Sequence, residues 1–157
     1  MSATTMNPMI GDDRVLTVTR MFDAPRETVW AAWIDFNHAT HFDGPPGHPM
    51  KSMRSDLRAG GTWRNVMRHD GKELPQGGVY REIKAPELLS FTFAWETDVG
   101  IKGLETLVTV TFEEIAPGKT RLTLQQGVFP TAQTRDGHRQ GWNRMLDSFA
   151  QFLAQRR

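Results

Sequence analysis

The sequence predicts an α+β domain in which a curved antiparallel β-sheet wraps around one long carboxyl-terminal helix. Three observations carry this prediction. Apolar residues after Gly141 recur at positions 142, 145, 146, 149, 152 and 153, the spacing of an amphipathic helix with one wide apolar stripe. Residues 89, 91, 93 and 95 are large and apolar at period two, which is typical of a strand that faces a core. Short turn segments separate the strand-like segments, and short turns join antiparallel neighbours.

Length and composition indicate a single domain without a nucleic-acid partner. The 157 residues suit one ordinary domain, and 19 Lys and Arg against 18 Asp and Glu leave the chain nearly neutral, with no dense basic run for a phosphate backbone. The absence of Cys excludes disulfides and thiolate chemistry and suits a reducing compartment. The first residues lack the pattern of a signal peptide, and no stretch reaches ~18 apolar residues. We therefore expect a cytoplasmic protein without membrane insertion.

The amino-terminal quarter is predicted to hold a tail, a strand and two short helices. Residues 1–13 are polar and interrupted by Pro and Gly, so we expect a disordered or extended tail before a domain at 14–157. Residues 14–22 are rich in β-branched and aromatic side chains and predict a strand with Leu16, Val18 and Phe22 inward. Arg20 shares that face, so it needs either the sheet edge or a carboxylate partner.

The first helix is predicted to begin after Asp23, a candidate cap, with Pro25 in its first turn. Trp30 and Trp33 recur at helical spacing and are interpreted as core residues. Residues 35–43 predict a second short helix, and the Gly- and Pro-rich residues 44–49 predict a loop that could cover a cavity mouth.

Six strands are predicted to follow, at residues 50–57, 62–69, 78–84, 89–95, 106–114 and 120–129. Asp70-Gly71 is a hairpin signal. The alternation in 106–114 directs Val108 and Val110 inward, whereas the inward phase of 78–84 stays open between Val79 and Tyr80. The last helix is predicted to begin at Thr131 or Thr134.

Several ordered motifs resemble one known family. They are Arg20-x-Phe22-Asp23-Ala24-Pro25-Arg26-x-x-Val29-Trp30-x-Ala32-Trp33, Asp56-Leu57-Arg58-x-Gly60-Gly61-x-Trp63, Gly78-Val79-Tyr80-Arg81-Glu82-Ile83-x-x-Pro86-Glu87-x-Leu89, residues 106–114 and Gly141-Trp142. From residue 14 onward the chain resembles the START-like (SRPBCC, Bet v 1-like) superfamily and, within it, the bacterial homologues of the activator of heat shock protein 90 ATPase. The resemblance implies a helix-grip fold with a hydrophobic cavity beneath the last helix, and it implies no single activity.

The predicted function is binding of a small hydrophobic ligand between sheet and last helix. The supply of five Trp, nine Phe and eight Met favours a pocket lined by large apolar side chains. The predicted ligand-binding residues are Trp63, Asn65, Met67, Tyr80, Phe93, Trp95, Val108, Val110, Trp142, Met145 and Phe149. Tyr80 and Asn65 are the predicted polar contacts. The alternative is that these side chains simply fill the core.

Two other functions stay open. The resemblance allows a chaperone ATPase-activator-like interaction module, and a cyclase- or hydrolase-type enzyme would need a titratable group in the same cavity. The candidate acid–base groups are Glu82, Glu96, Tyr80, His69 and His138. None is paired in a way that demands a perturbed pKa, and His138 is expected at the surface.

Metal binding and assembly are the remaining questions. His38 and His41 lie three apart, yet no third ligand is evident, so they are interpreted as surface histidines. We predict no catalytic residue, no metal and no cofactor, and an exposed strand edge or the amino-terminal arm could support a homodimer.

Overall fold

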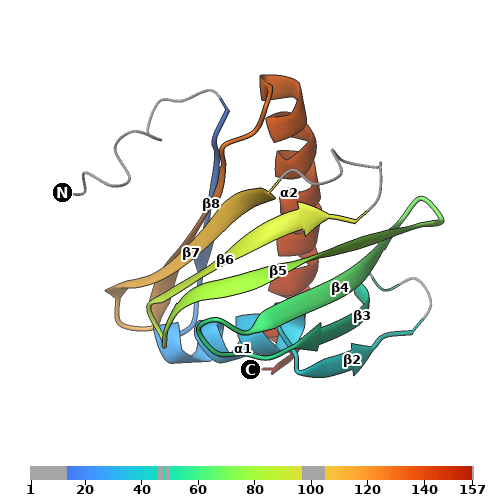
Figure 1. Cartoon of the computed structure of the whole chain (residues 1–157). Helices are drawn as coiled ribbons and strands as arrows, with labels where there is room; N and C mark the ends of the chain where they lie inside the picture. Colours follow the sequence, from blue (N-terminus) through green and yellow to red (C-terminus); the bar gives the residue numbers. More distant parts are fainter. Residues whose placement is uncertain (1–13, 46–47, 49, 97–104, 157) are drawn as a thin grey trace.

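A computed structural model describes residues 14–45, 48, 50–96 and 105–156, and shows one curved sheet with two helices on one of its faces (Figure 1). The helices are α1 (Arg26–Asn37) and α2 (Ala132–Arg156). The strands are β1 (Leu16–Phe22), β2 (His41–Asp43), β3 (Met50–Ser55), β4 (Thr62–His69), β5 (Lys72–Lys84), β6 (Leu88–Trp95), β7 (Glu105–Ala116) and β8 (Lys119–Gly127). The predicted tail 1–13, three residues of the predicted loop 44–49, residues 97–104 and residue 157 lie outside the described residues.

All neighbouring strands pair antiparallel, in the order β1-β8-β7-β6-β5-β4-β3-β2. The predicted fold class is thereby confirmed. The Asp70-Gly71 hairpin is present, and both residues have the positive φ that a tight two-residue turn requires. The phase that the sequence left open in β5 is now settled, because Tyr80 is fully buried while Val79 is 36% exposed.

The second short helix predicted over residues 35–43 is wrong. Helix α1 continues to Asn37, and the next element is the edge strand β2, in which Phe42 pairs with Met53 of β3. A three-residue edge strand has too short an alternation to be recognised, and its pairing partner lies ten or so residues away in the chain.

The start of α1 also differs from the prediction. Pro25 occupies the N-cap position and makes no side-chain cap, while Asp23 pairs with Lys119. The carboxylate of Glu114 on β7 instead accepts a hydrogen bond from the Arg26 N–H at 2.8 Å. A negative charge at a helix start is favourable, so a remote strand provides what a local cap usually does.

Helix α2 buries the predicted stripe against the sheet and α1. Met145, Leu146, Phe149 and Leu153 are buried, with Trp142 and Phe152 partly buried. Burying four such side chains contributes roughly 6–12 kcal/mol, an upper estimate. Arg20 on the edge strand β1 meets Asp147 of α2 at 3.0 Å, so the predicted carboxylate partner is present.

The two helices do not cover the sheet evenly. Helix α2 packs closely against β1 and α1, and α1 lies over β7 and β8. Figure 1 shows α1 beside the carboxyl-terminal end of α2, where Phe36 contacts Phe149 and Phe152. This arrangement leaves the part of the sheet formed by β3 to β6 less closely covered by helix.

Candidate functional site

A cavity of about 690 Å³ lies between β3–β6 and the two helices. Its volume falls in the range of small-molecule pockets, roughly 300–1,000 Å³. The lining includes large apolar side chains from α1, β3, β4, β6 and α2, among them Phe36, Met50 and Phe91. A second hollow of about 600 Å³ lies at Arg54, Arg64 and Glu96 and is spanned by the Arg64–Glu96 ion pair, so it suits an apolar molecule less well.

The structure brings seven of the predicted binding residues together around this cavity: Trp63, Asn65, Met67, Phe93, Trp95, Trp142 and Met145. The other four, Tyr80, Val108, Val110 and Phe149, are fully buried in the core and do not line it. Phe149 packs edge-on against Phe22 and Trp33, with ring centroids 5.4 and 5.1 Å apart. Its place is therefore between the helices and β1.

Trp63 is positioned by a close approach of strands β5 and β6. Its Nε1–H donates to the carbonyl oxygen of Thr92 at 3.0 Å. A Cβ atom on Gly78, the register partner of Trp63, would lie 1.9 Å from that same oxygen. Glycine is therefore required at position 78, and the indole is held with its donor satisfied and its apolar rings toward Phe91 and Phe93.

One end of the cavity is built around His38, which follows the last residue of α1. The ring is 4% exposed, its Nδ1 lies 3.1 Å from the Tyr80 hydroxyl, and its backbone carbonyl accepts from the Ser55 hydroxyl. Burial lowers the pKa of His38 to about 3 and raises the pKa of Tyr80 to about 12. Both side chains are therefore neutral at physiological pH, and the prediction of a surface histidine at position 38 is wrong.

His38 and His41 do not share a helix face. His41 lies on β2, is exposed, and sits 3.1 Å from Asp43. The helical spacing on which the metal hypothesis depended does not exist, because the chain leaves the helix between these two residues.

The cavity lining also contains buried polar atoms that have no hydrogen-bond partner among the described residues. Five of them belong to lining residues: Trp33 Nε1, Asn37 Nδ2, His38 Nε2 and Asn65 Oδ1, together with Arg68 Nε near the end of β4. Buried polar groups in native proteins are nearly always paired, so each such atom requires an explanation.

The other end of the cavity is built around His138 near the start of α2. Trp95 Nε1–H donates to His138 Nε2 at 2.8 Å, and His138 Nδ1 lies 3.0 Å from the carbonyl of Thr134. Because Nε2 accepts, the proton must be on Nδ1. Burial lowers the pKa of this ring too. The expected surface role is wrong, since the ring is partly buried and stacks on Phe129.

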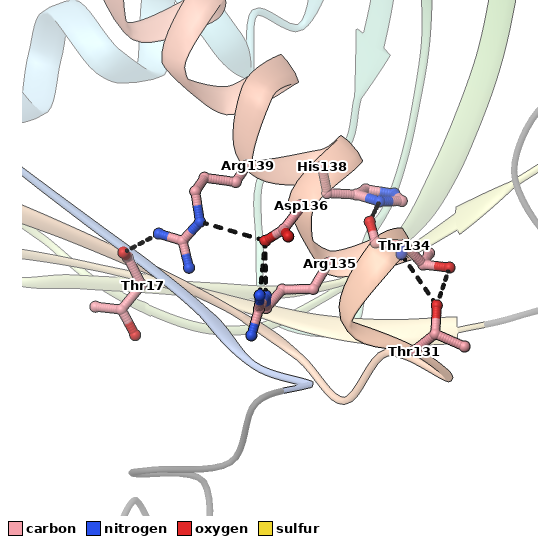
Figure 2. A network of polar contacts seen from close by, with 7 residues as sticks. All are labelled: Thr17, Thr131, Thr134, Arg135, Asp136, His138 and Arg139. Atoms are coloured by element: carbon pink, nitrogen blue, oxygen red, sulfur yellow. Dashed lines mark hydrogen bonds and ion pairs between the residues drawn. The ribbon is translucent and has the colours of Figure 1, made fainter.

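The first turn of α2 holds His138 in place. Figure 2 shows Thr131 capping the helix by accepting from the Thr134 N–H at 3.1 Å, and Asp136 lying between Arg135 and Arg139. Arg139 in turn donates to the carbonyl of Thr17 on β1 at 3.0 Å. Of the two starts that the sequence left open, Thr131 and Thr134, the structure favours the first, because α2 begins at Ala132, directly after Thr131.

The charged residues around the cavity are cationic. Among the described lining residues there is no Asp or Glu, while Arg68 and Arg144 are both present. Arg68 faces Glu73 across the β4–β5 pair, and Glu73 itself pairs with Lys51. The exposed Arg144 makes no ion pair within the described part of the chain. The cavity rim is therefore weakly positive.

Sequence reasoning missed Asn37, His38 and the two arginines as lining residues. Asn37 lies four residues after Trp33, so both fall on one face of α1, and this spacing is the signal that could have identified it. No local pattern marks His38, because its burial is produced by contact with Tyr80 and Phe91, more than 40 residues away in the chain.

Comparison with known proteins agrees with this architecture. The family model described as Activator of Hsp90 ATPase homolog 1-like protein matches residues 23–154. A comparison with curated proteins gave no match.

Solved structures share the fold at low sequence identity. Protein Ms6760 from Mycobacterium smegmatis is 23% identical, with a TM-score of 0.70 over 93% of this chain and 94% of that one. A protein from Arthrobacter aurescens is 21% identical, with a TM-score of 0.70 over 92% and 88% of the two chains. Protein NE0264 from Nitrosomonas europaea is 20% identical, with a TM-score of 0.68 over 92% and 97%.

Proposed function

Because the chain belongs to the family of Activator of Hsp90 ATPase homolog 1-like proteins, we propose that it binds a small, mostly apolar molecule in the cavity between the sheet and α2. The observation that carries the proposal is the cavity of about 690 Å³, whose walls include four Trp, three Phe and three Met side chains. The fold of this family supports a ligand-binding domain in general, and the cavity gives that role a location in this chain.

Two glycines on α2 provide a direct test. Gly137 and Gly141 both line the cavity, and a Cβ on Gly141 would come no closer than 3.8 Å to its nearest neighbour, Arg144 Nη2. Glycine costs about 1 kcal/mol relative to alanine inside a helix. Replacement therefore favours the helix while the added side chain takes volume from the cavity.

The experiment is titration of the neutral dye Nile red against Gly141→Ala and Gly141→Leu. We expect affinity to fall with the volume of the new side chain, by about tenfold or more for leucine, with no loss of thermal stability. The matched control is Gln140→Leu, which puts the same side chain on the exposed neighbouring residue and should leave the affinity unchanged. Equal affinities for wild type and Gly141→Leu would contradict binding in this cavity.

The other two functions have less support. Activation of a chaperone ATPase rests on the name of the family alone. Addition of the purified chain to a bacterial Hsp90, with an unchanged rate of ATP hydrolysis, would remove this candidate. Catalysis would use His38 or His138 in the cavity wall, and each ring already has one nitrogen in a hydrogen bond within the protein, His38 Nδ1 with Tyr80 and His138 Nε2 with Trp95.

The cellular location of the protein is also a proposal. We expect the protein in the cytoplasm, because a chain without Cys suits a reducing compartment. No helix within the described ranges is long and apolar enough to cross a membrane. A homodimer through an edge strand, β1 or β2, remains a prediction, and sedimentation velocity would test it.

A further inference from the structure

We propose that the ligand carries a neutral oxygen acceptor, such as a ketone or quinone carbonyl, at the end that lies against Trp33, Asn37 and His38. The inference rests on the proposed function and narrows the class of molecule that the cavity accepts. It follows from the hydrogen-bonding groups that the fold leaves unpaired.

Four of the five lining side chains with unpaired atoms are more than nine-tenths buried: Trp33 is 0%, Asn37 6%, His38 4% and Asn65 8% exposed. All four line the same cavity. A buried donor without an acceptor costs free energy in the folded protein, and a ligand that provides the acceptor recovers it on binding. Such a cluster in an otherwise apolar cavity is the usual means of orienting a bound molecule.

The backbone gathers these groups at one place. Trp33 and Asn37 are four apart on α1 and therefore share a face, and His38 follows directly. The rings of Trp33 and His38 have centroids 6.5 Å apart. Asn65 approaches from β4, on the same strand face as Trp63.

Two of the unpaired atoms at this end are donors whatever the tautomer of His38. Trp33 Nε1–H and the Asn37 amide nitrogen can only donate, whereas Asn65 Oδ1 can only accept. His38 Nδ1 lies 3.1 Å from the Tyr80 hydroxyl, which can donate or accept, so the tautomer decides the role of His38 Nε2. The two donors of α1 select a ligand group that accepts.

The acceptor is expected to be uncharged. Trp33, Asn37, His38 and Asn65 include no cation at neutral pH, and the burial that disfavours charge on His38 would equally disfavour a carboxylate beside it. Of the two lining arginines, Arg68, whose Nε is also unpaired, comes from the end of β4, and Arg144 comes from the exposed surface of α2.

The wall can adapt to bring donor and acceptor together. The unpaired atoms are covered by neighbouring side chains, so a ligand oxygen reaches them only if the lining shifts. Met50, Met67 and Met145 line the cavity, and flexible thioether side chains repack at low cost.

The test compares two nearly isosteric probes, 2-acetylnaphthalene and 2-isopropenylnaphthalene, which differ in a C=O against a C=CH₂ group. Each displaces Nile red from the wild-type protein. We expect the ketone to bind about tenfold more tightly, the effect of roughly 1.4 kcal/mol from hydrogen bonds to buried donors, although transfer from water favours the olefin. The infrared carbonyl stretch of the bound ketone should move to lower wavenumber.

Variants locate the preference. Asn37→Leu and Trp33→Phe each remove one donor and should reduce the ketone-to-olefin affinity ratio several-fold. Leu146→Val, which weakens a buried contact away from the lining, should leave the ratio as it is. The comparison of ketone and olefin binding to the wild-type protein tests the inference even if one of these variants folds poorly.

Three results would overturn the inference. Equal binding of ketone and olefin would show that the unpaired donors do not select the ligand, while leaving the proposed function intact. Tighter binding of 2-naphthoate than of the ketone at pH 7.5 would replace the neutral acceptor by an anion. Failure of both naphthalenes and of Nile red to bind would overturn the proposed function itself, and this inference with it.

Discussion

Of the three histidines that line the cavity, His38 and His138 are buried or partly buried, and the protein satisfies their hydrogen bonds differently. His138 near the start of α2 has both ring nitrogens paired, one with Trp95 and one with Thr134. His38 beyond the end of α1 is more deeply buried, yet only its Nδ1 is paired, with the Tyr80 hydroxyl, and Nε2 has no partner in the protein. Burial lowers the pKa of both rings.

This difference distinguishes the two ends of the cavity. The hydrogen bonds at the His138 end are complete within the protein, whereas the His38 end has unpaired groups that a ligand can bond. Around His138, Trp142 Nε1–H also has its acceptor, Gln126 Oε1 at 2.7 Å, and Gln126 donates to Thr106. That end is a closed network which a ligand can only disrupt. Around His38, three further lining residues have unpaired atoms, so a ligand can complete the network instead.

The pH dependence of stability should show the largest consequence of burying His38. The pKa of its folded form is about 3, against 6.5 in the unfolded chain. Above pH 6.5 neither state binds a proton and the group contributes nothing to pH dependence. Between pH 6.5 and 3 the unfolded state binds one more proton, so stability falls as pH falls. We expect a loss of about 2 kcal/mol from pH 6.5 to 4.5, because the slope rises from about half of its full value of about 1.4 kcal/mol per pH unit at pH 6.5.

Urea unfolding of the wild type and of His38→Phe over this pH range measures that loss. The His38→Phe variant should be less stable than the wild type at pH 7.5. The slope of its unfolding free energy against pH should be smaller by up to about 1.4 kcal/mol per pH unit, the value for one bound proton. Leu146→Val should lower the whole curve in parallel. Burial also lowers the pKa of His138, so its effect on the pH dependence of stability has the same sign. If this pH dependence disappears in His138→Phe and persists in His38→Phe, His138 and not His38 is its main source.

Removal of the Tyr80 hydroxyl at the His38 end and of the Trp95 indole N–H at the His138 end should lower the free energy of unfolding by different amounts. Tyr80→Phe leaves His38 Nδ1 buried without a partner, at a cost of about 1–3 kcal/mol. Trp95→Phe removes the donor to His138, but that ring is only partly buried and water can replace the bond, so we expect about 0.5–1.5 kcal/mol, part of it from lost packing. Equilibrium unfolding at pH 7.5 compares them, and a larger loss in Trp95→Phe would contradict the assignment of the two ends.

Much of the fold could be predicted because alternation and helical periodicity report burial directly. Leu89, Phe91 and Phe93 are buried as their period-two pattern indicates, and the stripe of α2 faces the sheet. Strand β2 was not predicted because three residues are too few to show a period of two. The inward face of β5 was not predicted because a register shift between Tyr80 and Glu82 interrupts the pairing of β5 with β6.

The cavity lining was harder to predict than the core. Alternation identifies the inward face of a strand but does not say whether a helix packs on it. Val108 and Val110 on β7 are fully buried and do not line the cavity, whereas Trp63 and Asn65 on β4 lie where the helices leave space. That distinction depends on the position of α2 against β1, which the ion pair of Arg20 with Asp147 helps to fix. Neither contact is visible in a local window of sequence.

The smallest expected effect concerns charge at the rim. Arg144 is exposed, lines the cavity and has no ion pair among the described residues, so it can meet an anionic group on a ligand that protrudes from the cavity. An exposed pair of this kind contributes about 0.2–1 kcal/mol, or roughly one- to fivefold in affinity. Arg144→Gln should weaken binding of the anionic dye 1-anilinonaphthalene-8-sulfonate by that factor at low salt and should not change the affinity for Nile red. Because salt screens exposed charges, the difference should shrink at 0.5 M NaCl. An equal loss for both dyes would mean that Arg144 acts through the shape of the cavity and that the acceptor site at His38 alone recognises the polar group of the ligand.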